Sequence, residues 1–83
     1  MDILQIFAKN VKKYRLGRGY SQEKLAEYSG LHRTYISAVE RSRRSIALEN
    51  VQKIANALNI ETHLLFVDSQ VIEEDERELS PEL

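Results

Sequence analysis

The side chains best suited to recognise another molecule lie within residues 33–44, where arginines and hydroxyl residues recur at helical spacing. At 100° per residue, Arg33, Thr34 and Ser37 fall on one side of a helix, and Ile36 and Val39 fall on the other. A guanidinium can donate two parallel hydrogen bonds to a guanine, and hydroxyls can bond several bases. The pattern predicts one buried face and one face able to read DNA, although such a pattern on a lone helix is more often simply solvated.

The segment that follows adds positive charge beside this face. Residues 41–45 read RSRRS, which places Arg41, Arg43 and Arg44 within four positions. A loop of guanidiniums at the end of a reading helix is well placed for phosphates and for the edge of a groove. Solvation alone is the alternative interpretation of these arginines.

The elements around the reading helix form a recognisable arrangement. Ser21 is a good N-cap for a short helix over Gln22–Ser29, and Gly30 can enter a left-handed turn without a Cβ penalty. A second helix over residues 33–41 follows that tight turn. Two short helices joined in this way indicate a helix-turn-helix.

The stretch SQEKLAEYSGL, followed by HRTYIS and AVE, resembles the lambda-repressor-like helix-turn-helix superfamily. Within it, HRTYIS followed by ERSRR is most similar to the controller proteins of restriction-modification systems. The resemblance covers residues 5–67 and implies an all-α, five-helix domain that binds a pseudo-palindromic operator as a homodimer. It also implies a regulator that activates its own operon when scarce and represses it when abundant.

The resemblance assigns roles to individual residues. It implies base contacts from Arg44, in addition to Arg33, Thr34 and Ser37, and an ion pair between Arg15 and Glu40. The ion pair agrees with the position of Glu40 beside core residue Ile36, where a charge needs a partner. The residues expected on the DNA backbone are Gln22, His32, Tyr35, Arg41, Arg43 and Asn50.

Size and composition limit the possible architectures. A chain of 83 residues accommodates one small domain, and a core of this size favours further burial between two copies. The chain has no cysteine, which excludes disulfides and thiolate metal sites, and it shows no targeting or membrane-spanning segment. We therefore expect a cytoplasmic protein that does not contact a membrane.

The net charge of −1 conceals a division along the chain. Residues 1–60 contain eleven Lys and Arg against five acidic residues, whereas residues 61–83 contain one Arg against eight acidic residues. The local charges are therefore +6 and −7. Attraction to phosphate depends on local potential, so a basic body with an acidic tail is compatible with a DNA-binding domain.

Apolar periodicity predicts the remaining elements. Residues 2–16 and 47–58 form amphipathic helices, the second with Leu48 in its core stripe and with Ala47 as an unusual N-cap. Residues 60–67 form a fifth, strongly apolar segment. We expect the folded domain to span residues 1–70 and residues 71–83 to be an acidic, disordered tail. The residues expected at the dimer interface are Ile60, His63, Leu64, Phe66 and Val67.

No constellation for catalysis is visible. His32 and His63 lack the spacing of zinc ligands, and no Gly-rich phosphate loop occurs. We expect a non-enzyme without cofactor or metal, with double-stranded DNA and a second copy as partners and RNA polymerase as a further candidate. The alternatives are a phage-type repressor, the antitoxin of a toxin-antitoxin pair and, more remotely, a helical protein-interaction module.

Overall fold

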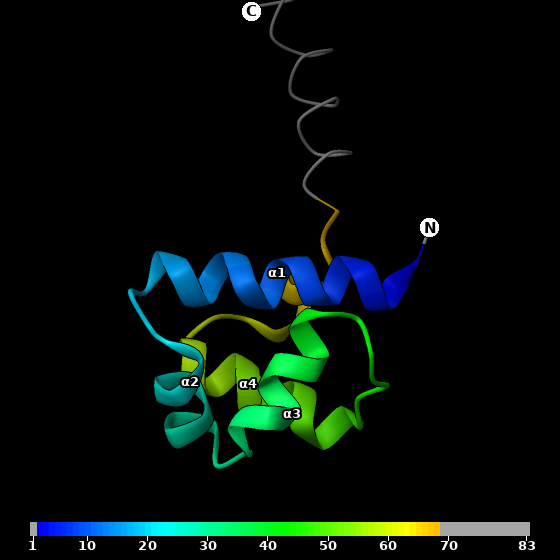
Figure 1. The fold of residues 1–83 in the computed structure, drawn as a ribbon. Helices are drawn as coiled ribbons and strands as arrows, with labels where there is room; N and C mark the ends of the chain where they lie inside the picture. Colours follow the sequence, from blue (N-terminus) through cyan, green and yellow to red (C-terminus); the bar gives the residue numbers. More distant parts are fainter. Residues whose placement is uncertain (1, 69–83) are drawn as a thin grey trace, which may run out of the picture.

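The computed structural model describes residues 2–68 and is all-helical over that range, with no strand. Four α-helices are followed by one short 3-10 helix, and Figure 1 shows α1 lying across the layer formed by the other three. The bounds are α1 Ile3–Gly17, α2 Gln22–Ser29, α3 Arg33–Glu40, α4 Leu48–Leu58 and η1 Thr62–Phe66. The predicted acidic tail lies outside the described residues.

Local signals set the helix ends. The Asp2 carboxylate accepts from the Leu4 and Gln5 amides at the start of α1, and the Ser21 hydroxyl accepts from the Lys24 amide at 3.0 Å. The predicted cap at Ser21 is therefore confirmed. Gly30 and Asn59 end α2 and α4 in the left-handed conformation, at φ of 75° and 57°.

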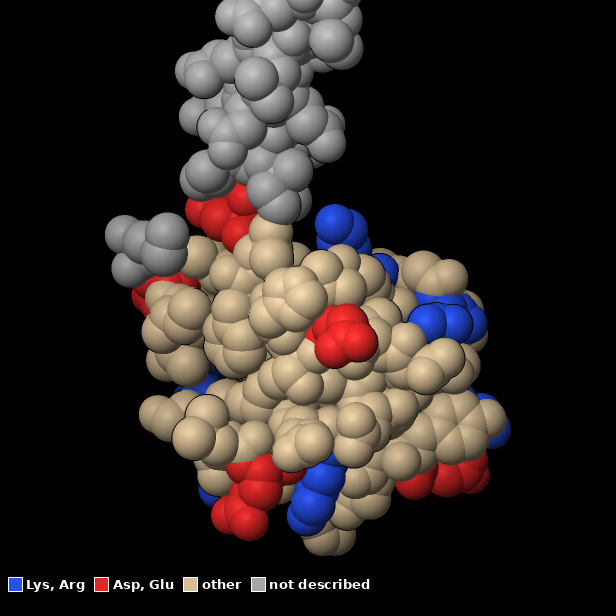
Figure 2. Space-filling view, turned by 180° about the vertical axis from the view of Figure 1, so that it is seen from behind, with Lys and Arg blue, Asp and Glu red and all other residues tan. Residues whose placement is uncertain are grey.

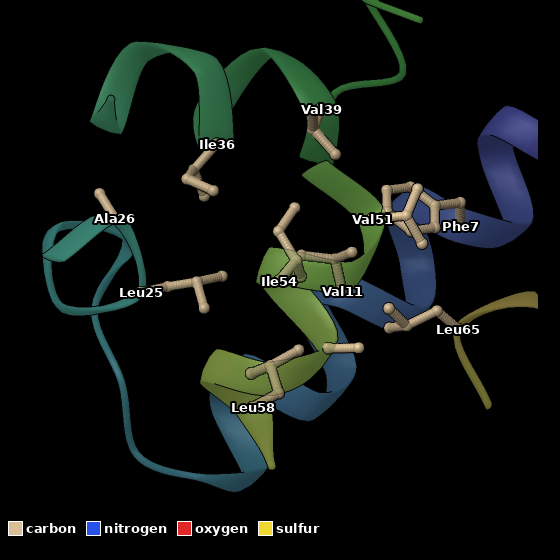
Figure 3. Close-up of a cluster of buried hydrophobic side chains, with 11 residues drawn as sticks. Phe7, Val11, Leu25, Ala26, Ile36, Val39, Val51, Ile54, Leu58 and Leu65 are labelled. Atoms are coloured by element: carbon tan, nitrogen blue, oxygen red, sulfur yellow. The ribbon is translucent and has the colours of Figure 1, made fainter. Parts of the chain in front are cut away.

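One side-chain cluster holds the helices together (Figure 3). Each α-helix and η1 contributes an apolar side chain, so no pair of elements could bury its apolar face alone. The fully buried members with the largest volumes are Phe7, Val11, Leu25, Ile36, Ile54, Leu58 and Leu65.

The predicted core position of Leu48 is wrong, because this side chain is 85% exposed. Leu48 is the first residue of α4, and helical side chains point back toward the N-terminus. Its side chain therefore extends past the end of α4, whereas Val51 one turn later is buried. The apolar stripe begins one turn after the position that periodicity predicts.

The fifth element is shorter than residues 60–67 and is a 3-10 helix. The Leu64 amide donates to the Glu61 carbonyl at 3.1 Å, the i to i+3 bond of this tighter helix. The carbonyls of Leu65 and Val67 instead accept from the Asn10 side-chain amide, each at 2.9 Å. These two bonds hold the segment against α1.

Candidate nucleic-acid interface

The turn between α2 and α3 is fixed by several hydrogen bonds. The Ala26 carbonyl accepts from the amides of Gly30 and Leu31, at 2.9 and 3.2 Å. The Ser29 hydroxyl oxygen accepts from the Leu31 amide at 3.3 Å, and the Ser29 side chain is itself buried. Gly30 adopts a positive φ that residues with a Cβ rarely occupy. The orientation of α3 relative to α2 is thus set by backbone geometry.

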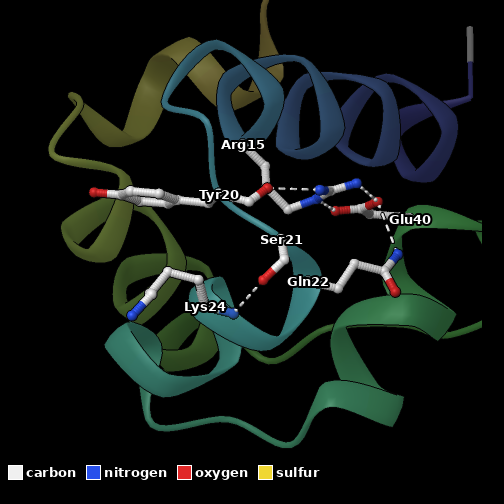
Figure 4. A network of polar contacts seen from close by, with 6 residues as sticks. All are labelled: Arg15, Tyr20, Ser21, Gln22, Lys24 and Glu40. Atoms are coloured by element: carbon white, nitrogen blue, oxygen red, sulfur yellow. Dashed lines mark hydrogen bonds and ion pairs between the residues drawn. The ribbon is translucent and has the colours of Figure 1, made fainter.

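A buried guanidinium fixes the other end of α3 (Figure 4). Arg15 Nε donates to Glu40 Oε2 at 2.6 Å and a terminal nitrogen donates to Glu40 Oε1 at 3.0 Å, so the ion pair predicted from the sequence is present. Arg15 also donates to the Tyr20 carbonyl at 2.8 Å. The side chains of Arg15 and Glu40 are only 9% and 4% exposed. The pair joins α1, the α1–α2 connection and the last residue of α3.

Gln22 is part of the same network. Its side-chain amide donates to Glu40 Oε1 at 3.1 Å, a bond that sequence reasoning did not anticipate. Gln22 was expected to contact the DNA backbone, and its side chain is therefore already oriented by Glu40 of the same chain. The side-chain oxygen of Gln22 can only accept hydrogen bonds. A side-chain contact to a phosphate would therefore come from the same nitrogen that already donates to Glu40.

The outward face of α3 carries the side chains predicted to read bases. Arg33 and Thr34 are exposed, and Ser37 is partly buried. Among the described residues, Arg33 pairs with the carboxylate of Glu23 on α2, with Nε and Oε1 4.0 Å apart and both side chains largely exposed. A contact this long between solvated groups contributes little. Arg33 is therefore available to an external acceptor.

A second group of predicted residues lies around an open groove of about 330 Å³. Within it, the Arg44 guanidinium carbon lies 5.3 Å from the centre of the Tyr35 ring. The Asn50 amide donates to the Tyr35 hydroxyl oxygen at 3.3 Å. The groove is lined by Gly30, Leu31, His32, Thr34, Tyr35, Arg44 and Asn50. Five of these residues were predicted to contact DNA, but the contacts among Tyr35, Arg44 and Asn50 were not.

The loop after α3 turns sharply toward α4. Ser42 has a φ of 56°, and the Arg43 amide donates a hydrogen bond to the Ala38 carbonyl at 2.9 Å. This is a helix C-terminus closed by a left-handed residue, a position where glycine is usual. The side chains of Arg41, Arg43 and Arg44 are exposed. His32, which precedes α3, is also exposed and makes no side-chain cap bond.

One lysine on α2 has a perturbed pKa. A hydrogen bond from Lys24 to Glu27, at 3.2 Å, raises the pKa of Lys24 above its usual 10.5, and the Glu27 charge acts in the same direction. Lys24 therefore remains positive at neutral pH. Within residues 2–68, no three His, Cys, Asp or Glu side chains are grouped so that they could hold a metal ion.

The residues expected at a dimer interface lie on or beside η1. Ile60, Leu64, Phe66 and Val67 are partly buried, and His63 is exposed. Phe66 also stacks on Phe7 of its own chain, with ring centroids 5.3 Å apart, so it serves the core as well. The face seen in Figure 2 is mostly uncharged, with isolated charged side chains.

Three comparisons relate the chain to known proteins. Residues 11–65 match the family described as helix-turn-helix. The control protein C.SmaI of Serratia marcescens is 54% identical over 59 residues, which cover 71% of this chain and 70% of that protein. A hypothetical transcription factor of Neisseria meningitidis serogroup B is 45% identical over 69 residues. That match covers 83% of this chain but only 65% of the relative's length.

Solved structures of a hypothetical transcription factor and of a controller protein are also similar to this chain. The crystal structure of the hypothetical transcription factor NHTF from Neisseria has a TM-score of 0.83 and 42% identity, covering 88% of this chain and 84% of that one. The controller protein C.Esp1396I, as a tetramer in complex with its natural 35-base-pair operator, has a TM-score of 0.75 and 34% identity. This second match covers 89% of this chain and 95% of that chain. Within residues 2–68, no helix is long and apolar enough to cross a membrane.

Proposed function

The chain belongs to the helix-turn-helix family, and we propose that it is a sequence-specific DNA-binding regulator of transcription, of the restriction-modification controller type. The observation that carries this proposal is a helix fixed at both ends that leaves cationic and hydroxyl side chains free on its outward face. Arg33 and Thr34 are exposed there, and Arg44 lines the adjoining groove. The relatives named control proteins, and the operator complex of one of them, support the same function.

The mechanism is occupancy of operator DNA. Helix α3 enters the major groove, where Arg33, Thr34, Ser37 and Arg44 contact base edges. The phosphate contacts come from Gln22, His32, Tyr35, Arg41, Arg43 and Asn50. Two copies related by a two-fold axis present their α3 helices about 34 Å apart, the spacing of successive major grooves on one face of the duplex. No enzymatic step, cofactor or metal is required, and RNA polymerase is the partner through which occupancy would change transcription.

A binding experiment with two matched arginine variants tests this function. The preferred duplex is first selected from a random library with the wild-type protein, and isotherms are then measured on it and on a random duplex at several salt concentrations. The wild type should prefer the selected duplex by a factor of about 10³ or more. No preference for any duplex, or no binding, would contradict the proposed function.

The two variants separate base reading from phosphate anchoring. Arg33→Ala should weaken binding to the selected duplex by about 1–3 kcal/mol and change random binding little, because a bidentate base contact discriminates sequences. Arg43→Ala should weaken both complexes and reduce the salt slope by about one per lost phosphate contact, hence about two per dimer. An equal loss on both duplexes for Arg33→Ala would make Arg33 a phosphate contact and leave base reading to Thr34, Ser37 and Arg44.

A further inference from the structure

We propose that Asn50 is a positioning residue, which acts through the Tyr35 hydroxyl to hold Arg44 in place for base reading. The inference rests on the proposed function, and it gives Asn50 a different role from the phosphate contact expected from the sequence. Three separate elements meet here: α3 supplies Tyr35, the following loop supplies Arg44, and the first turn of α4 supplies Asn50.

The contacts lead from the partly buried Asn50, through Tyr35, to the exposed side chain of Arg44. The Asn50 amide donates to the Tyr35 hydroxyl oxygen at 3.3 Å, and the Tyr35 ring lies 5.3 Å from the Arg44 guanidinium carbon. Tyr35 and Asn50 are partly buried, whereas Arg44 is exposed. The ring therefore has a hydrogen-bonded anchor at its far end and a cation near its π system, an arrangement in which the guanidinium is attracted to the ring.

The chemistry of each group fits this role. A guanidinium near an aromatic ring can keep its edge N–H groups free to donate to a base. Because Asn50 donates to the phenol oxygen, the Tyr35 proton is directed elsewhere and remains available to a phosphate oxygen. A side chain ordered before binding loses less conformational entropy when the complex forms. Within residues 2–68, Arg33 has the 4.0 Å contact with exposed Glu23 and no ring contact of this kind.

A double-mutant cycle tests the coupling. The variants are Asn50→Ala, Arg44→Ala and the two combined, each titrated on the selected and the random duplex at several salt concentrations. Asn50→Ala should lower affinity for the selected duplex about five- to tenfold, within the range of couplings between contacting residues. It should leave the salt slope unchanged and cause no further loss in the Arg44→Ala background. A loss in that background as large as in the wild-type background would show that Asn50 acts independently of Arg44, as a direct contact to DNA would, and would overturn the proposal.

Two further variants serve as matched controls. Tyr35→Phe retains the ring but removes the hydroxyl, and with it both the acceptor for Asn50 and a phosphate contact. It should therefore lose at least as much affinity as Asn50→Ala, and adding Asn50→Ala to Tyr35→Phe should cost nothing further. Gln52→Ala alters an exposed amide on the same helix and should leave affinity unchanged. Equal thermal midpoints for Asn50→Ala and Gln52→Ala would show that the affinity change does not come from unfolding.

A measurement on the free protein separates this inference from the proposed function. The Arg44 side-chain protons near the Tyr35 ring should show a ring-current shift in the NMR spectrum. Asn50→Ala should reduce that shift, and Gln52→Ala should leave it unchanged. If no duplex were bound but the shift depended on Asn50, the proposed function would fail while the positioning contact stood. A shift insensitive to Asn50→Ala would refute the positioning role whatever the DNA experiments gave.

Discussion

At the scale of single residues, the Arg15–Glu40 pair shows why one carboxylate can matter more than its neighbours. Both side chains are nearly inaccessible, and every observed bond of the Arg15 guanidinium goes to Glu40 or to the Tyr20 carbonyl. The pair itself need not be very stabilising, because both charges were removed from water. Its disruption is costly, since the remaining charge stays buried without a partner.

We therefore expect Glu40→Ala to lower the free energy of unfolding by about 3 kcal/mol. The matched control is Glu27→Ala, because Glu27 also pairs with a cation, Lys24, but its side chain is 62% exposed. That change should cost less than about 1 kcal/mol. Urea denaturation of both variants provides the measurement, and equal midpoints would count against a structural role for the buried pair.

Among the residue-scale predictions, the ion pair between Arg15 and Glu40 is confirmed. Glu40 beside Ile36 indicated a buried charge in need of a partner, and the family resemblance supplied Arg15. The bonds from Asn10 to Leu65 and Val67 were missed, although a polar residue three positions after Phe7 in an apolar stripe was a visible signal. Its acceptors lie more than 50 residues away, so local periodicity could not identify them.

At the scale of elements, the ends of α2 and α4 offer a direct comparison of helix caps. Ser21 accepts a hydrogen bond from a first-turn amide of α2, whereas Ala47 at the corresponding position of α4 cannot. Ala47 nevertheless has φ of −71° and ψ of 147°, close to the −74° and 167° of Ser21. The backbone is already suited to a capping side chain.

Ala47→Ser should consequently stabilise the protein by about 1 kcal/mol, the usual value of an N-cap hydroxyl. Ser21→Ala should destabilise it by a similar amount. Thermal unfolding monitored by circular dichroism measures both changes. No rise in the midpoint for Ala47→Ser, together with a fall for Ser21→Ala, would show that another group already satisfies the amides at the start of α4.

Element positions were largely predictable because capping residues and apolar spacing are local. The bounds predicted for α2, Gln22–Ser29, agree with the structure, as does the end of α4 at Leu58. Two features were not predictable from local pattern. Leu48 is in register with the apolar stripe but is the first residue of α4, so its side chain extends past the end of the helix, and the 3-10 geometry of η1 accompanies bonds to Asn10 from another helix.

At the scale of the whole molecule, we expect two copies to associate through η1 and its flanking residues. The segment lies behind α1 in Figure 1, and residues 67–68 leave it on the side of α1 away from α3. An interface there would leave both α3 helices free for DNA. Leu64 is the better probe, because Phe66 also packs against Phe7 and its replacement would disturb the core.

Leu64→Asp should produce a monomer that retains helical circular dichroism, since an acidic side chain would be desolvated at the interface. The wild type should sediment as a dimer at tens of micromolar, the range of ordinary regulator affinities. Leu48→Asp is the control, because it makes the same change at an 85% exposed leucine on another part of the surface. A wild-type monomer, or a dimer that survives Leu64→Asp, would rule out this interface.

The buried guanidinium of Arg15 also has a consequence for the shape of the DNA. Because it holds the last residue of α3 to α1, the reading helix cannot tilt without breaking a network of short bonds. In a dimer, any mismatch between the helix spacing and straight B-form DNA would then be absorbed by the duplex, and bending a site of 20–30 base pairs by 40–90° costs roughly 1–6 kcal/mol. Easily kinked TA steps between the half-sites should therefore bind better than a stiff A-tract, although no side chain touches them. Equal affinity for two duplexes that differ only in that spacer would show that the protein is the partner that deforms.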